Sequence, residues 1–305
     1  MPLSIIELFG RTPTSSQLRD SVRNRHCPFL REQCVKNFND GMPNGACTLA
    51  AVQDSTPTIC CPRRLYANSY QILRTIAASA FGPDVPVTTE RGRIASGRRV
   101  VVPFGHRLGG ELRIAYQKTH FAVDWVLALV EADGRLLAFA PVEVQTIDTT
   151  GSYRRQSWTM QRDCGSTRIA SYVEPPEKAS NFNWENVNKR ILPQLITKGH
   201  IVRREPLCTK GLYFVCPTPV FNKIRGRLAG EMLSYAPQPG AITFHHYGLD
   251  IASRSDPKPL ILAGESTTTI DQLAIALTAP RELPPSGQYG QVIQRAIQDR
   301  LQGGL

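Results

Sequence analysis

The stretch LLAFAPVEVQTIDTTGSY, residues 136–153, holds the feature that decides the fold we expect. It begins as an apolar strand, which Glu143 and Gln145 then interrupt one residue apart. Side chains alternate along a strand, so these two project from the same face. A carboxylate in a buried strand is costly unless another group compensates its charge. The sequence should therefore carry a partner that faces Glu143.

The turn before this strand supplies that partner. Asp133-Gly134 separates it from a second apolar run at residues 121–131, FAVDWVLALVE, which we interpret as one strand. Asp-Gly between two apolar runs predicts a β-hairpin with a two-residue type I′ turn. In that register Asp124 lies directly opposite Glu143, with the two Cβ atoms about 5 Å apart.

Two carboxylates that face each other among apolar neighbours repel, and the sequence leaves several ways to relieve this repulsion. The two carboxylates could share a proton, form a hydrogen-bonded structural pair, or bind a divalent cation. Glu111 in GGELRIAY is a further acidic candidate, because we expect this segment to form the strand immediately before the hairpin. The alternative for Glu111 is a solvated residue at a strand edge.

Carboxylates around a hard cation, with a polar side chain beside them, suit the hydrolysis of phosphodiesters. In the common D…(D/E)-x-K pattern that neighbour is lysine, whereas this chain has Gln145. An amide donates hydrogen bonds to water or phosphate but carries no positive charge. The missing charge should then come from elsewhere, for example from a second metal ion or from Arg154 and Arg155.

The composition indicates a soluble protein that binds polyanions. The net charge is +11 over 305 residues, which favours nucleic acid as the partner, although it also fits an ordinary basic protein. No apolar run approaches the length of a membrane span, and the N-terminus MPLSIIELFGRTP lacks the features of a secretory signal. We expect a cytoplasmic protein with no membrane partner.

The cysteines are concentrated near the N-terminus. Residues 1–66 are polar and irregular, and they would need a staple in order to fold. Without a secretory signal a disulfide framework is not expected, so the cluster suggests a metal. We therefore divide the chain into a metal-binding region, residues 1–66, and a mixed α/β domain, residues 67–305. Five of the eight cysteines lie within the first 61 residues: Cys27, Cys34, Cys47, Cys60 and Cys61.

Several motifs follow one another along much of the chain: CPFL at 27–30, GAC at 45–47, LGGELRI at 108–114, VDWVLALVE at 123–131, VEVQTIDTTGSY at 142–153 and, more weakly, NVNKR at 186–190 and LITKGH at 195–200. In this order they resemble the NotI-type restriction endonucleases, a branch of the PD-(D/E)xK nucleases. The resemblance implies a restriction-endonuclease-like fold, with a mixed-sheet core flanked by helices. It also implies Asp124, Glu143 and Gln145 as the active-site signature, with Gln in place of Lys as a family trait. Glu111 is the further acidic member, and the three acids would hold a catalytic Mg²⁺.

The resemblance also implies a structural iron held by four thiolates, here those of Cys27, Cys34, Cys47 and Cys61. Their spacing, with 6, 12 and 13 residues between them, is not the tight C-x2-C of ordinary zinc sites. A tetrahedral sulfur site accepts zinc as well as iron, so both metals remain open. The doublet at 60–61 leaves the fourth ligand open. The motif Cys-Pro favours Cys61, and Cys60 would then be a buried free thiol.

Polar residues after the catalytic strand are the candidates for DNA contact. A first group lies nearest to that strand, and a later group offers side chains that read base edges or hold phosphates. The alternative for the later group is an ordinary polar helix start. The two groups are Ser152, Tyr153, Arg154 and Arg155, and Asn186, Lys189 and Arg190.

These features predict a type II restriction endonuclease, which binds double-stranded DNA at a specific site and hydrolyses phosphodiesters with Mg²⁺. Because palindromic sites have two-fold symmetry, we expect a homodimer. Two alternatives stay open. One is another PD-(D/E)xK nuclease, in repair or phage defence. The other is a DNA-binding protein with a structural metal that does not cleave.

Overall fold

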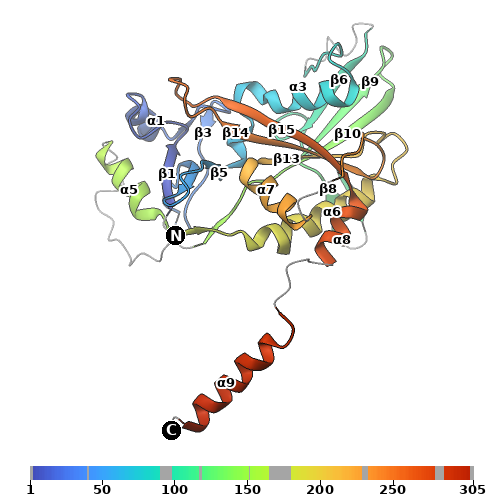
Figure 1. The fold of residues 1–305 in the computed structure, drawn as a ribbon. Coiled ribbons are helices and arrows are strands. Elements are labelled where there is room, and N and C mark those ends of the chain that lie inside the picture. The colour runs from blue at the N-terminus through green and yellow to red at the C-terminus, as the bar shows by residue number, and fades with distance from the viewer. Residues whose placement is uncertain are drawn as a thin grey trace.

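The computed structural model of the chain describes residues 3–39, 41–89, 98–116, 119–150, 152–164, 180–228, 233–278 and 285–302. Its centre is a six-stranded mixed sheet in the order β15-β14-β13-β10-β9-β6 (Figure 1). Strands β10, β13 and β14 run parallel, and the other neighbours are antiparallel. The strands are β6 (Val100–Gly105), β9 (Trp125–Val130), β10 (Leu136–Val144), β13 (Leu212–Pro217), β14 (Ala241–Leu249) and β15 (Leu260–Thr269).

Helices cover both faces of this sheet (Figure 1). On one face, Ile76 of helix α3 and Trp125 of β9 belong to the same buried cluster. On the other face, Leu195 of helix α6 joins Phe214 of β13 in a second cluster. The predicted mixed α/β core with flanking helices is therefore confirmed, whereas its PD-(D/E)xK type stays a prediction. The helices are α3 (Ala67–Phe81), α6 (Leu192–Val202), α7 (Thr218–Arg227) and α8 (Ile270–Thr278).

The central strands explain the continuous apolar runs in the sequence. Every residue of β13 is buried, because parallel neighbours flank both of its edges and helices cover both faces. Strand β10 lies next to it and is buried from Ala140 to Val144. Glu143 is therefore an interior residue, and only 3% of it is exposed.

The hairpin between β9 and β10 has a longer turn than the predicted two-residue type I′ turn. Glu131 N–H donates to the carbonyl of Arg135 at 2.9 Å, and Gly134 N–H donates to the carbonyl of Glu131 at 2.9 Å. A type I′ turn needs positive φ at both central residues. Only Gly134, with a φ of +88°, adopts it, and Asp133 does not. The predicted turn type is therefore wrong, although Asp-Gly does form the turn.

A bulge in β10 restores the predicted register. The first pair of the ladder, Leu136 with Val130, is one residue out of that register. The register shifts within the next two residues, and Val142 then pairs with Trp125 as predicted. Bulges are common beside active sites, where they re-aim side chains. The alignment predicted for the end of the hairpin thus holds, although the turn differs.

The N-terminal region contains more regular structure than its sequence suggests. Three strands form an antiparallel sheet in the order β1-β4-β5. Leu8 and Leu49 from this sheet belong to the same buried cluster as Leu195 of α6. The region therefore shares its core with the rest of the chain, and the boundary between residues 66 and 67 remains a prediction. The strands are β1 (Leu3–Leu8), β4 (Ala46–Ala51) and β5 (Thr58–Ile59).

A buried arginine connects this N-terminal sheet with the segment between β14 and β15. Arg64 donates to the two carboxylate oxygens of Glu7 at 2.8 and 3.1 Å, and the Thr48 hydroxyl donates to the same carboxylate at 2.6 Å. Arg64 also donates to the carbonyl of Lys258, which lies between β14 and β15. Its guanidinium lies over the ring of Phe29, 4.4 Å from the centroid.

Shorter elements surround these two sheets. The hairpin of β7 and β8 is a separate two-stranded sheet, and β11 pairs with β12. Helix α9 stands away from the body of the molecule (Figure 1). None of the helices in the described ranges is long and apolar enough to cross a membrane. The remaining elements are α1 (Leu18–Asn24), β2 (His26–Cys27), β3 (Glu32–Gln33), α2 (Pro62–Leu65), β7 (Arg113–Tyr116), β8 (Thr119–Ala122), β11 (Thr149–Thr150), α5 (Arg154–Asp163), β12 (Asn181–Phe182), the π-helix η1 (Val187–Ile191) and α9 (Gln288–Gln302).

Candidate active site

The ends of strands β9 and β10 bring Asp124 and Glu143 together. Val142 pairs with Trp125, so the next position along both strands places Asp124 beside Glu143. The expected single strand over residues 121–131 is broken at this point, because β8 ends at Ala122 and β9 begins at Trp125. The break frees the Asp124 carboxylate to accept a hydrogen bond from the backbone N–H of Val144 at 2.7 Å.

Glu143 affects the ionisation of Asp124. Burial and, next in size, the nearby charge of Glu143 together raise the pKa of Asp124 to about 7. The Val144 N–H and the ammonium of Lys198 act against this rise in the pKa of Asp124, because both favour the charged carboxylate. The repulsion expected from the sequence is therefore present, and the surrounding groups compensate it only in part.

Lys198 is the functional residue that sequence reasoning missed. Its Nζ, which comes from helix α6, donates to Oε2 of Glu143 at 2.5 Å. The residues are 55 positions apart in the chain, so no strand pattern or turn connects them. The signal available was the weak LITKGH motif at 195–200, which contains this lysine.

Gln145 contacts the second oxygen of the same carboxylate. Its Nε2 donates to Oε1 of Glu143 at 3.3 Å, as expected for two side chains on one strand face. Its backbone N–H donates to the carbonyl of Val215 on β13 at 3.0 Å, which fixes the chain just beyond β10. Glu143 is thus held between an amide from its own segment and an ammonium from α6.

Glu111 lies at the margin of this group. Its charge contributes to the raised pKa of Asp124 as a smaller cause, so the two carboxylates are within electrostatic reach. Glu111 is exposed and forms an ion pair with Arg113 at 3.3 Å. The strand expected immediately before the hairpin is present as β7, which begins two residues after Glu111 and pairs with β8. Within the described ranges, no three His, Cys, Asp or Glu side chains are grouped closely enough to hold a metal ion.

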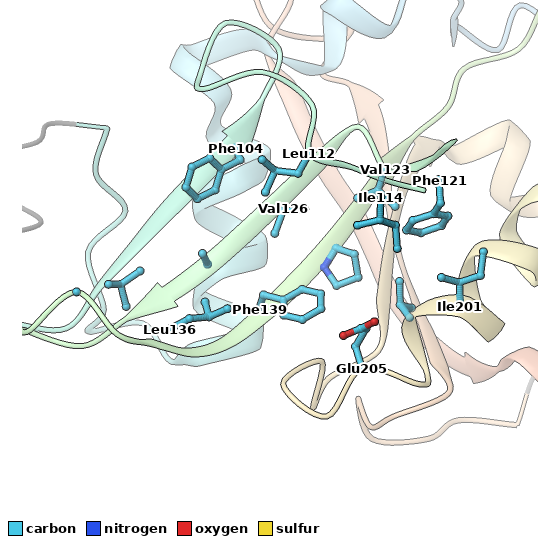
Figure 2. Close-up of a pocket in the computed structure, with 15 residues that line it drawn as sticks. Phe104, Leu112, Ile114, Phe121, Val123, Val126, Leu136, Phe139, Ile201 and Glu205 are labelled. Atoms are coloured by element: carbon cyan, nitrogen blue, oxygen red, sulfur yellow. The ribbon is translucent and has the colours of Figure 1, made fainter. Parts of the chain in front are cut away.

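Two hollows lie near this group, although neither Asp124 nor Glu143 lines them. The first is an apolar pocket of about 470 Å³, and its lining includes Val126, Phe139 and Phe121 (Figure 2). A second hollow of about 340 Å³ lies between β8 and α6, and His120 and Lys198 line it. The second hollow gives the Lys198 side chain access to solvent, and 21% of that side chain is exposed.

The cysteines named from the resemblance line a single cavity in the N-terminal region. The cavity has a volume of about 240 Å³, and its lining includes Cys27, Cys34, Cys47 and Cys61. Burial raises the pKa of the Cys47 thiol, and the charges of Cys61, Glu7, Cys34 and Cys27 raise it further. The four cysteines, which all belong to the described residues, are nevertheless not grouped closely enough here to hold a metal ion, so the metal site stays a prediction.

The neighbouring Cys60 is turned away from this cavity. Its thiol lies 3.5 Å from Nζ of Lys36, which also donates to the carbonyls of Ala46 and Cys60 at 3.1 and 3.2 Å. Burial raises the pKa of the Cys60 thiol, while the ammonium of Lys36 acts against that rise. Cys61 lines the cavity and Cys60 does not, while the choice of Cys61 as the fourth ligand stays a prediction.

The first group of predicted DNA contacts begins helix α5. Ser152 Oγ accepts a hydrogen bond from the backbone N–H of Arg154 at 3.1 Å. Tyr153 is buried, and its hydroxyl is hydrogen-bonded to Asn44 at 2.8 and 3.0 Å. Arg155 is exposed, whereas the guanidinium of Arg154 lies 5.0 Å from the centroid of the Phe38 ring. The contacts described for Ser152, Tyr153 and Arg154 do not involve Glu143.

The second group gathers around Asp148, shortly after β10. Asn186 Nδ2 donates to Asp148 at 3.0 Å, and Arg190 forms an ion pair with it at 3.5 Å. Lys189 is exposed and pairs with Glu185 one helical turn earlier. The structure thus brings Asn186 and Arg190 to the end of the catalytic strand, and DNA contact by either group remains a prediction.

The fold and the site describe a mixed α/β protein that gathers carboxylates at the end of a central strand, an arrangement suited to hydrolysis of phosphate esters. The chain belongs to the NotI restriction endonuclease family, whose family model matches residues 17–232. The match includes both acids, Gln145, Lys198 and the N-terminal cysteines. Membership implies, at the level of the family, a restriction endonuclease that acts on double-stranded DNA. A comparison with curated proteins gave no match.

Proposed function

We propose that this chain is a type II restriction endonuclease of the PD-(D/E)xK kind, with Mg²⁺ as its catalytic cofactor. The observation that supports this most directly is the adjacent pair Asp124 and Glu143, buried beside an amide and an ammonium in a member of this family. Apolar residues would fill the same space at lower electrostatic cost, so a structural role alone gives no reason for acids here.

Asp124 and Glu143 would hold the cation, with Glu111 as a further oxygen ligand. Carboxylate oxygens are the donors that a hard cation prefers. The raised pKa of Asp124 supports this assignment, because burial and the charge of Glu143 both disfavour its charged form, which a bound cation would favour. When bound, a divalent cation would stabilise the negative charge of the phosphoryl group during hydrolysis.

The side chains around these acids would orient the other reactants. The amide of Gln145 would hold the attacking water, since an amide both donates and accepts hydrogen bonds. The water oxygen bonds to phosphorus while one P–O bond of the DNA backbone breaks. The water loses a proton to solvent, and the leaving oxygen gains one. The products are a phosphomonoester and a hydroxyl group.

Basic and polar side chains near the end of β10 would hold the DNA. Arg155 at the start of α5 and Lys189 on η1 are exposed and would contact phosphates. Asn186 and Arg190 carry the donors that read base edges, and both are near Asp148. A homodimer would present two such surfaces to the halves of a palindromic site.

We further propose that Cys27, Cys34, Cys47 and Cys61 hold a structural iron or zinc. The donor set supports this, because four thiols line one cavity and thiolates are the usual ligands for both metals. Lys36 is buried next to them, and its pKa is raised by the neighbouring thiol groups despite its burial. Its ammonium would balance part of the negative charge of the thiolates.

Plasmid cleavage tests the nuclease proposal. We expect wild type to cut supercoiled plasmid with Mg²⁺, and Glu143→Gln to lose cleavage by about 100-fold or more while it still binds DNA. Discrete fragments support restriction, and a smear supports a less specific nuclease of the same superfamily. Absence of cleavage with any divalent cation would favour a DNA-binding protein that does not cut.

Metal analysis of two adjacent variants tests the cysteine site. Cys61→Ser should lose the bound metal, whereas Cys60→Ser should keep one metal ion per chain. Elemental analysis measures the content, and visible absorption distinguishes coloured ferric thiolate from colourless zinc. Loss of metal from Cys60→Ser alone would contradict the assignment of Cys61.

A further inference from the structure

We propose that Lys198 supplies, from helix α6, the positive charge that Gln145 does not bring to the active site. This inference rests on the proposed nuclease function and names a positioning residue for it. Lys198 contacts Glu143 directly, so its charge acts on the carboxylate that Gln145 also touches. In the usual pattern both roles belong to one strand residue, and here two elements share them.

The two oxygens of Glu143 have different partners. Oε2 accepts from Lys198 at 2.5 Å, and Oε1 accepts from Gln145 at 3.3 Å. Two donors on one carboxylate fix the rotation of its plane, because each oxygen has its own partner. Only 3% of Glu143 is exposed, so water cannot replace a lost partner at full strength. Lys198 therefore sets both the orientation and the charge balance of this acid.

The packing of α6 holds Lys198 in place. Leu195 and Val202 are buried on the same helix, one turn before and one turn after the lysine. Gly199, the next residue, lies so close to α8 that an added Cβ would meet Ile270 Cγ1 at 2.7 Å. Such close contact leaves little room for α6 to shift or rotate. The distance between Lys198 and Glu143 is thus a consequence of how α6 is seated on the sheet.

The ammonium of Lys198 also lies where DNA phosphate can approach it. The side chain lines the hollow between β8 and α6, together with His120 and Thr197. A flexible stem of four carbons allows Nζ to stay near Glu143 and to face a phosphate at this opening. Of the two arginines expected to supply the charge, Arg154 lies over the ring of Phe38, and Arg155 is exposed at the start of α5.

A relocation experiment tests this inference. Lys198→Gln should lower the rate of plasmid cleavage by about 100-fold, the usual loss when one preorganised charge is removed from an active site. The double variant Gln145→Lys, Lys198→Gln restores an ammonium beside Glu143 from the strand. It should recover at least about 10-fold of that loss, and Lys198→Arg should also retain more activity than Lys198→Gln.

Three controls separate charge from folding. Lys223→Gln removes an exposed lysine from α7 and should leave cleavage unchanged. DNA binding with Ca²⁺ in place of Mg²⁺ should be nearly the same for wild type and Lys198→Gln. Thermal unfolding of each variant shows whether α6 still packs. If Lys198→Gln is unstable, the folded Lys198→Arg and the double variant carry the test.

The outcomes distinguish this inference from the proposed function. Full cleavage by folded Lys198→Gln, with Glu143→Gln inactive, overturns the role of Lys198 and leaves the nuclease proposal intact. Failure of the double variant to exceed folded Lys198→Gln also overturns it, because a charge at this place would then have no effect. If wild type fails to cleave DNA whichever divalent cation is added, the proposed function is wrong and this inference is wrong with it.

Discussion

At the scale of single residues, the folded environment of Asp124 changes the pKa of its carboxyl group. An aspartate in an unfolded chain has a pKa near 3.9. Burial, followed by the charge of Glu143, raises the pKa of Asp124 to about 7 in the folded protein. A raised acid pKa favours the neutral form, so its stabilising effect is present below the unfolded pKa and is lost as pH rises through about 7.

Asp124→Asn should therefore remove a pH-dependent cost. Without added divalent cation, we expect the variant to gain free energy of unfolding relative to wild type as pH rises from about 4 to about 8, by an amount on the order of 4 kcal/mol for a pKa raised to about 7. The side-chain carbonyl of the asparagine can still accept the hydrogen bond from the Val144 N–H, so the variant and wild type keep the same hydrogen bond. Urea unfolding at each pH measures the difference, and a difference that stays constant with pH contradicts this account.

Sequence reasoning reached Asp124, Glu143 and Gln145 because their relation is local. One turn and the alternation of side chains determine which residues face each other across a hairpin. Lys198 could not be reached in this way, since its contact with Glu143 depends on how α6 packs against the sheet. Which side chain of a packed helix contacts a strand residue depends on the tertiary structure, and the local sequence pattern does not show it.

At the scale of elements, the β9–β10 hairpin shows how a correct register can follow from an incorrect turn. The predicted turn had two residues, whereas the observed loop is longer and a bulge in β10 compensates for it. Register here is specified by burial, because a slip of one residue would turn Glu143 to the apolar side. The turn type depends on whether Asp133 adopts a positive φ, and the Asp-Gly sequence alone does not determine this.

The turn glycine offers a test at this scale. Gly134 has a φ of +88° and open space around its Cα, so Gly134→Ala should cost about 1 kcal/mol through backbone strain alone. Gly226 on α7 has equally open space without a positive φ, and Gly226→Ala should be neutral or slightly stabilising. Equal effects of the two variants on the midpoint of urea unfolding would count against the assigned turn.

At the scale of the whole molecule, the N-terminal sheet and the central sheet share one core. The sequence suggested an irregular region stapled by a metal, and the structure adds strands that the polar, cysteine-rich composition concealed. Short strands such as β5 have too few residues to show an alternating pattern. The pair Arg64 and Glu7 is buried within the N-terminal part, with 1% and 0% of the side chains exposed, and Arg64 also donates to the carbonyl of Lys258 between β14 and β15.

Removal of this arginine should weaken the whole molecule. Arg64→Ala leaves the Glu7 carboxylate buried without its cation, and we expect a loss of about 3–5 kcal/mol in the free energy of unfolding. Arg162 forms an exposed pair with Asp163, and Arg162→Ala should cost no more than about 1 kcal/mol. Similar losses for both variants would show that the buried Arg64 contributes no more to stability than an exposed arginine does.

The digestion of long double-stranded DNA tests the central claim most directly. Purified wild type and Glu143→Gln are incubated with the same viral or bacterial DNA in Mg²⁺, and the fragments are separated by size. A reproducible set of discrete fragments from wild type, with intact DNA from Glu143→Gln, is the predicted result. Intact DNA from wild type with every divalent cation tried, or equal cutting by both proteins, would contradict the account.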